Sequence, residues 1–97
     1  MIQHTIVFKL KHSPGSPEEK EFLADTFKFS DIPGVQNFKC LRQTSKQNNY
    51  DFGISMEFAS QEDYDRYTHH PVHQTLVKER WIPEVSAFLE IDYASLA

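Results

Sequence analysis

The chain has 97 residues and a formal net charge of −4, with acidic and basic residues mixed along its length. No run of Lys or Arg is present to neutralise a phosphate backbone, so the composition excludes a typical nucleic-acid-binding protein. The length provides for one domain, residues 1–97, and eight Phe, four Tyr and one Trp favour a packed fold over disorder. No apolar run approaches the roughly 20 residues of a membrane span and no secretory leader is recognisable, so we expect no membrane segment.

The first half of the chain predicts a strand, a helix and a second strand. Residues 2–10 alternate between apolar and polar positions, and His4 interrupts the apolar face. Ser16, Pro17 and Glu19 form a helix-start signal with a capping box, and this helix should end before residues 32–34. Residues 35–44 predict a weaker strand.

The second half repeats the order with a strand, a helix and a strand. Residues 50–59 show the clearest alternation, and Ser60 then caps a helix that Pro71 interrupts and that continues to about residue 81. Residues 85–93 predict the last strand. Its larger apolar residues, among them Leu89 and Ile91, are expected to face the helices.

The resulting order, βαββαβ, predicts an α+β, ferredoxin-like fold in which both helices cover one face of a four-stranded antiparallel sheet. The other face would carry Val7, Leu41 and Phe88 among polar and small residues. That face is too apolar in places to remain wholly wet, so we predict that it packs against the same face of a second copy, giving a homodimer with two-fold symmetry.

The single cysteine, Cys40, has no partner for an internal disulfide, which indicates a reducing compartment and a cytoplasmic protein. A reactive thiol is the alternative, but a small core residue on a strand is the favoured interpretation.

Three of the five histidines lie between Tyr67 and His73, which makes this segment the first candidate site. A neutral histidine acts as a general base near pH 7, and a tyrosine hydroxyl polarises a substrate oxygen. The structural interpretation, favoured for His69 and His70, is that they are solvated residues at a helix end. For His73, just beyond the break at Pro71, a role in a site and a role in the core are evenly balanced.

His4 is the second candidate, because its strand position points it toward the helices. A buried imidazole needs a partner, since unsatisfied polar atoms cost on the order of 1–3 kcal/mol. Periodicity alone favours a satisfied core histidine; the alternative is that His4, Tyr67 and His73 line one cavity. His69 and His73 have a spacing that would suit a metal on an unbroken helix, but Pro71 disrupts it, and we predict no metal. Phosphate-binding loops and nucleophile elbows are absent, and we predict no cofactor.

Four segments resemble the stress-responsive A/B barrel domain family: residues 2–10, residues 50–58, residues 67–73 with the motif His-Pro-x-His, and residues 88–93. The resemblance covers nearly the whole chain. It implies a ferredoxin-like protomer whose sheet pairs with a second copy to form a dimeric α+β barrel.

This family includes plant stress-induced proteins and a polyketide cyclase that forms olivetolic acid. The resemblance implies that Tyr67 and His73 occupy the positions of the catalytic tyrosine and the catalytic base of the cyclase, and that His4 lines the pocket. The cyclase has a further pocket histidine on the third strand, where this chain carries Phe52. Phe52 is thus expected to line the pocket and to change its shape and polarity.

Three functions remain open at this point. In the first, the protein binds a small apolar or aromatic ligand in a pocket and has no assigned activity. In the second, it is a cofactor-free lyase, cyclase or isomerase with His73 as base and Tyr67 as hydrogen-bonding partner. The third is a dimeric barrel similar to cofactor-independent monooxygenases. Whether the chain is an enzyme is left undecided.

Overall fold

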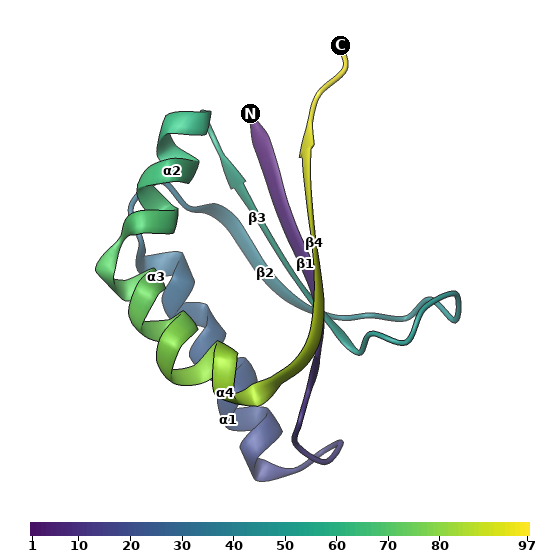
Figure 1. Ribbon diagram of the computed structural model, residues 1–97. Coiled ribbons are helices and arrows are strands. Elements are labelled where there is room, and N and C mark those ends of the chain that lie inside the picture. The colour runs from purple at the N-terminus through teal and green to yellow at the C-terminus, as the bar shows by residue number, and fades with distance from the viewer.

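Four strands form one antiparallel sheet in the computed structural model, which describes residues 1–97 (Figure 1). They are β1 (Ile2–Leu10), β2 (Gln36–Arg42), β3 (Phe52–Phe58) and β4 (Val85–Ala94). Their spatial order is β2-β3-β1-β4, so the first strand lies in the middle and the last strand forms an edge. The predicted ferredoxin-like fold is confirmed.

All helical segments cover the same face of the sheet (Figure 1). They are α1 (Pro17–Asp25), the 3₁₀ segment η1 (Thr26–Asp31), α2 (Gln61–His69), α3 (Pro71–Leu76), the π-helical segment η2 (Val77–Trp81) and α4 (Ile82–Glu84). None of them combines the length and the apolar character that crossing a membrane requires.

Both helices begin at the predicted serine caps. The hydroxyl of Ser16 accepts a hydrogen bond from the backbone N–H of Glu19 at 3.2 Å, and the Glu19 carboxylate accepts one from the N–H of Gly15 at 3.1 Å. The hydroxyl of Ser60 accepts from the N–H of Asp63 at 3.2 Å. These bonds satisfy backbone donors that the first turn of a helix leaves free.

The first helix departs from its expected course after Asp25, where it tightens into the 3₁₀ segment η1. A 3₁₀ turn has three residues instead of 3.6, so it changes which side chains face the sheet. Phe29 is consequently buried at 6% exposure, whereas Phe27 is 53% exposed and contacts Phe38 edge-on.

The hydrophobic core fills the space between the sheet and the helices. It consists of Phe8, Leu10, Phe22, Phe29, Ile32, Phe52, Ile54, Met56, Phe58, Tyr67 and Leu76. β3 contributes every second residue, as its alternation predicts.

The orientation of β4 differs from the prediction because of a β-bulge. The step from Leu10 to Lys9 on β1 is matched by the two-residue step from Val85 to Ala87 on β4, which leaves Ser86 as an extra residue. Since side chains alternate along a strand, one extra residue exchanges the two faces of everything that follows.

Phe88, Glu90 and Asp92 therefore lie on the helix side, opposite Phe8, Ile6 and His4 in that order. The prediction that Leu89 and Ile91 face the helices, and that Phe88 faces away, was wrong.

The face of the sheet away from the helices is consequently more apolar than predicted. Leu89, Ile91 and Tyr93 of β4 lie there together with Val7 of β1 and Leu41 of β2. Four of these side chains are 39–53% exposed in the single chain. Contiguous apolar surface of this kind marks an interaction site.

Candidate functional site

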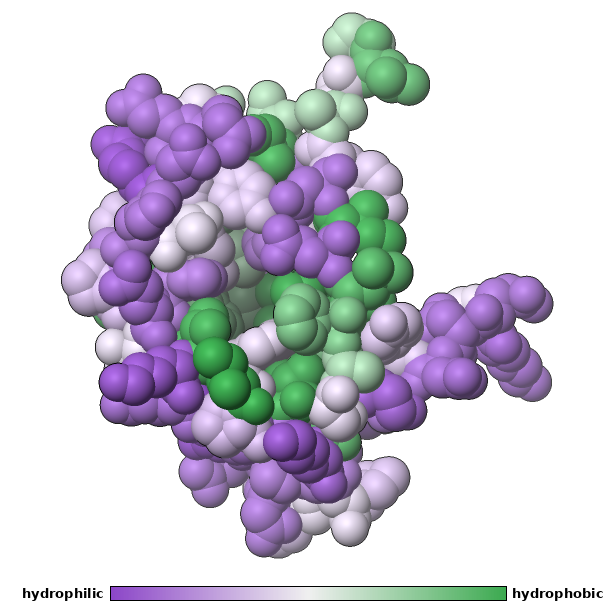
Figure 2. All heavy atoms as spheres, viewed as in Figure 1, coloured by the Kyte–Doolittle hydropathy of each residue, from purple (hydrophilic) through white to green (hydrophobic).

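A cavity of about 380 Å³ lies between the sheet and the helices. Figure 2 shows it as a hollow between the helical layer and β4, with hydrophobic atoms on its walls and hydrophilic atoms above it. Four of its twelve lining residues carry polar groups suited to chemistry: His4, Tyr67, His73 and Glu90. No Lys or Arg is among the lining residues. The volume and the mainly apolar walls are typical of sites for small organic ligands.

His4 lines this cavity and is 7% exposed. It lies opposite Asp92 in the β1–β4 register, and its Nδ1 is 2.6 Å from the Asp92 Oδ1. A carboxylate only accepts hydrogen bonds, so Nδ1 carries the proton and Nε2 is left as the basic nitrogen of the neutral ring.

Tyr64 of α2 joins this pair to Glu90. Its hydroxyl donates to the Asp92 Oδ2 at 2.7 Å, lies 3.3 Å from the Glu90 Oε1, and places its oxygen 2.9 Å from the His4 Nδ1. Burial, the hydrogen bond to Asp92 and the charges of Glu90 and Asp92 raise the pKa of Tyr64, so the phenol stays protonated. We call His4, Tyr64, Glu90 and Asp92 the His4 cluster.

Tyr67, also from α2, is 3% exposed and lines the cavity beside His73. The two rings meet edge-on with centroids 4.6 Å apart. Burial, followed by the charge of Glu90, raises the pKa of Tyr67. The hydroxyl of Tyr67 is thus a hydrogen-bond donor at any physiological pH.

His73 reaches the cavity because Pro71 ends one helix and starts the next. Pro71 is the first residue of α3, and the ring nitrogen Nδ1 of His70 caps that helix by accepting the N–H of Val72 at 3.1 Å. His73 follows in the first turn. Its own Nδ1 is buried without a hydrogen-bond partner, a costly arrangement in an apolar environment.

Burial, followed by the nearby ring of His4, lowers the pKa of His73; a backbone contact with Thr68 acts in the opposite direction without reversing this. The imidazole of His73 is therefore neutral at pH 7 and available as a proton acceptor. It is the only side chain in the molecule with a buried polar atom that lacks a partner.

The structure thus places His4, Tyr67 and His73 around one cavity, and places the other candidates elsewhere. His69 is exposed and its Nδ1 lies 2.8 Å from the carbonyl oxygen of Asp65. His70 is the helix cap described above.

Phe52 is not part of the cavity wall, which corrects the expectation that it lines the pocket. It lies at the opposite end of β3, 4% exposed, where its ring packs 5.7 Å from Phe8 and beneath the guanidinium of Arg42. The lining residues from β3 are Ile54 and Met56 instead.

Glu90, Asp92 and Tyr64 are site residues that the sequence analysis missed. The two acids were assigned to the outer face because the alternation of β4 was continued through the bulge at Ser86. The need of a buried His4 for a partner was the available signal, and the partner is the residue directly across the ladder.

The only grouping with metal-ligand character is His4, Glu90 and Asp92, whose ligand atoms all lie within 4.8 Å of one another. The hydrogen bond between His4 and Asp92 already engages one nitrogen and one oxygen of this set.

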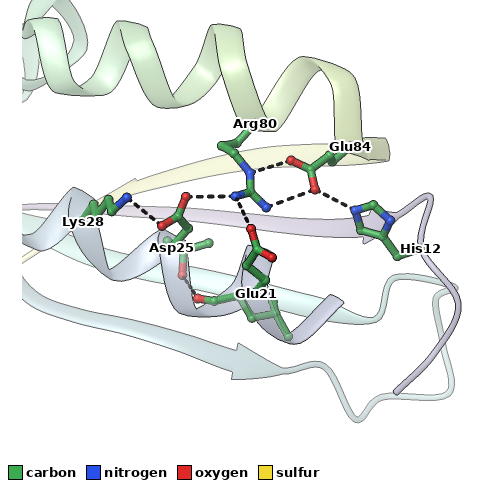
Figure 3. Close-up of polar contacts among 8 residues, drawn as sticks. His12, Glu21, Asp25, Lys28, Arg80 and Glu84 are labelled. Atoms are coloured by element: carbon green, nitrogen blue, oxygen red, sulfur yellow. Dashed lines mark hydrogen bonds and ion pairs between the residues drawn. The ribbon is translucent and has the colours of Figure 1, made fainter. Parts of the chain in front are cut away.

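A second ionic cluster holds the helical wall of the cavity in place (Figure 3). Arg80 of η2 binds both carboxylate oxygens of Glu84, at 2.6 and 3.1 Å, and reaches Asp25 and Glu21 of α1 at 3.1 and 3.2 Å. His12 contacts Glu84 from the other side at 2.7 Å.

We call these five residues the Arg80 cluster. Burial opposes ionisation of Glu84, but Arg80 and His12 outweigh it and lower the pKa of Glu84. The cluster joins α1 to the segment whose side chains Val77, Trp81 and Ile82 line the cavity.

The chain was compared with protein-family models, curated sequences and solved structures, and two of these comparisons found matches. The family model "Stress Responsive A/B Barrel Domain" matches residues 2–95. The structure of a Dabb family protein with a ferredoxin-like fold from Mesorhizobium loti is 55% identical, with a TM-score of 0.97 over 99% of this chain and 97% of that one. No curated protein sequence matches the chain significantly.

Two more distant structures share the fold. A hydroxynitrile lyase from Passiflora edulis is 14% identical, with a TM-score of 0.84 over 99% of this chain and 94% of that one. A dimeric ferredoxin-like protein of unknown function from Thermobifida fusca is 20% identical, with a TM-score of 0.75 over 97% and 90%. On the family match and the near-identical fold of the Mesorhizobium protein, the chain belongs to the stress-responsive A/B barrel domain (Dabb) family.

Proposed function

We propose that the cavity binds a small neutral ligand with an aromatic or apolar body, and that His73 removes a proton from it while Tyr67 hydrogen-bonds to its oxygen. The observation that carries the proposal is the convergence of His4, Tyr67 and His73 on one mainly apolar cavity. The hydroxynitrile lyase from Passiflora edulis has the same fold, which supports the view that this fold can carry a lyase activity.

The proposed step is proton abstraction from a carbon next to a carbonyl group. The neutral imidazole of His73 accepts the proton, the electron pair of the broken C–H bond moves toward the ligand oxygen, and the hydroxyl of Tyr67 stabilises the negative charge that develops there. Return of the proton to another carbon gives an isomerase, loss of a leaving group gives a lyase, and attack on a second carbonyl gives a cyclase.

The charge of the site supports a neutral ligand. Glu90 is the one charged residue in the lining, and no Lys or Arg accompanies it. An anionic ligand would leave water without gaining a cationic partner and would be repelled by the carboxylate.

The test uses 2-indanone, a neutral aromatic ketone with acidic α-hydrogens, in D₂O. We expect the protein to accelerate α-hydrogen exchange, followed by NMR, and we expect His73→Ala and Tyr67→Phe each to reduce the rate at least tenfold. His69→Ala, which removes an exposed imidazole of the same segment, is the matched control and should retain the rate.

Exchange that is no faster than in buffer, or that is insensitive to both cavity variants, would contradict catalysis. Retained binding of 2-indanone with no acceleration would instead support a non-catalytic ligand-binding protein.

We also propose that two copies associate through the open face of the sheet. Leu89, Ile91 and Tyr93 form an apolar strip along β4 on this face, and the Thermobifida fusca protein of the same fold is dimeric. Sedimentation or light scattering at micromolar concentration should give twice the 11.4 kDa chain mass. Leu89→Asp should shift the protein to monomer, whereas Leu96→Asp near the C-terminus should not. A monomeric wild-type protein would refute the dimer.

We further propose a cytoplasmic location. The lone Cys40 is half-buried on the helix side, and burial raises the pKa of its thiol, which supports a structural residue in a reducing compartment. Cell fractionation with an antibody against the protein tests this, and recovery outside the cytoplasmic fraction would contradict it.

A further inference from the structure

The cavity shares one of its walls with a second hollow on the surface. This depression, about 470 Å³ and open to solvent, lies between α2 and the end of β4. Tyr64 and Asp92 line it, whereas His4 and Glu90 line the cavity. The four residues of the His4 cluster thus divide evenly between the two sides of the wall.

Hydrogen bonds connect the cavity side of this wall to the side of the surface depression. The His4 ring reaches Asp92 at 2.6 Å, and Asp92 reaches the Tyr64 hydroxyl at 2.7 Å. Tyr64 in turn lies 3.3 Å from Glu90, back on the cavity side. No apolar side chain interrupts this sequence of contacts. The Asp92 side chain is 34% exposed, so this series of hydrogen bonds ends in contact with water.

We propose that the His4–Asp92 pair, held by Tyr64, is a relay that exchanges protons between the cavity and the surface depression. The proposal rests on the proposed function, because it supplies and removes the protons of that same site. It explains why a buried ring of β1 is paired with a carboxylate that faces solvent.

The proposed transfer balances in protons and charge. His4 Nε2 accepts a proton from the cavity while its Nδ1–H passes to the Asp92 Oδ1, and the carboxylic acid so formed releases its proton to water in the depression. The imidazole ends as its other neutral tautomer, and Asp92 ends as a carboxylate. The reverse sequence brings a proton from water into the cavity. Histidine is the side chain best suited to such exchange, because its two ring nitrogens allow it to take up a proton on one side and release one on the other.

Asp65 provides a matched comparison within the depression. It lines the same hollow, but its carboxylate accepts a hydrogen bond from Gln61 at 2.9 Å and makes none with the side chains of the His4 cluster. Replacing Asp65 changes the charge of the depression without interrupting the relay.

The first experiment follows the isomerisation of allyl phenyl ketone to phenyl propenyl ketone in D₂O and compares product formation with deuterium incorporation at the γ-carbon. Isomerisation reports proton abstraction and return to another carbon, and deuterium reports exchange with solvent. We expect the two rates to match in the wild type and in Asp65→Asn. In Asp92→Asn, isomerisation should persist while deuterium incorporation falls at least threefold behind it.

Deuterium that keeps pace with isomerisation in Asp92→Asn would overturn the relay and leave the proposed function standing. An equal fall of both rates would assign Asp92 a purely structural role and would overturn the relay as well.

The second experiment does not depend on turnover, so it separates failure of the relay from failure of the proposed function. In ¹⁵N-histidine-labelled protein, NMR should show the Nδ1–H tautomer for His4, with its ring proton exchanging rapidly with water although the ring is 7% exposed. Asp92→Asn should slow that exchange at least tenfold, Tyr64→Phe should alter it in the same direction, and Asp65→Asn should leave it unchanged. Exchange that is slow in the wild type, or unaffected by Asp92→Asn, would overturn the relay even if the cavity catalyses nothing.

Discussion

The ribbon of β1 and β4 carries a histidine–carboxylate pair at each end, and the two pairs have opposite characters. At one end His12 contacts Glu84 at 2.7 Å, and at the other His4 contacts Asp92 at 2.6 Å. Arg80 adds a permanent cation to the first pair, whereas only Tyr64 and a further acid, Glu90, join the second.

This difference separates a cluster of fixed charges from one in which we propose that a proton moves. In the Arg80 cluster the positive charge is fixed and each carboxylate has a cationic partner, so proton exchange gains nothing there. In the His4 cluster the charge balance depends on a mobile proton, because histidine is the only group able to become cationic. The second cluster, and not the first, borders the cavity.

The largest expected effect comes from breaking the Arg80 cluster. Arg80→Met should lower the free energy of unfolding by about 2 kcal/mol, because three carboxylates lose their shared cation and α1 loses its link to η2. Urea denaturation measures this, with Lys78→Met, which removes an exposed charge on the same helical segment, as control. A loss no greater than that of the control would show that the cluster contributes little to stability.

A smaller effect is expected from pH, through His73 beside the His4 cluster. Burial keeps the pKa of His73 below its ordinary value of about 6.5, so the unfolded chain takes up a proton before the folded protein does. Stability from this residue is complete above about pH 6.5 and is lost as pH falls toward the folded-state pKa, by at most about 1.4 kcal/mol per pH unit.

His73→Gln should flatten this part of the stability profile, measured by denaturation at a series of pH values. His70→Gln, which alters the half-buried cap of α3, should keep the wild-type slope. An unchanged profile in His73→Gln would mean that the ring titrates normally.

The smallest expected effect concerns ligand charge. Glu90→Gln removes the charged group of the cavity wall, and should improve binding of 1-naphthoate relative to neutral 2-naphthol by roughly threefold to fivefold, in line with less than about 1 kcal/mol of relieved repulsion. Fluorescence titration of both probes gives the ratio, and Glu79→Gln on the helix surface is the control. An equal ratio in wild type and Glu90→Gln would show that Glu90 does not select ligand charge.

Local patterns were sufficient to predict most of the fold. Ser16 and Ser60 capped their helices as expected, and the alternation of residues 52–58 placed a buried face on β3 without error. These features depend on neighbours in the chain, which is why a single sequence reveals them.

The site was predictable only in part. His4, Tyr67 and His73 were singled out because their residue types are unusual at their positions, and the structure brings them together. Asp92 and Glu90 were not singled out, because the face to which their side chains point depends on one unpaired residue in the β1–β4 ladder. A bulge is set by pairing between distant segments, and periodicity within one strand does not reveal it.

That extra residue, Ser86, has a consequence for how the protein can change over evolutionary time. Because the bulge sets the parity of the rest of β4, pairing Ser86 regularly with Lys9 would turn Glu90 and Asp92 outward and bring Leu89 and Ile91 to the helix side, whereas deleting Ser86 would leave a regular ladder with the present faces. The polar wall of the pocket and the apolar surface of the opposite face are therefore inherited together. A lineage cannot lose one by a change in the β1–β4 pairing without also losing the other.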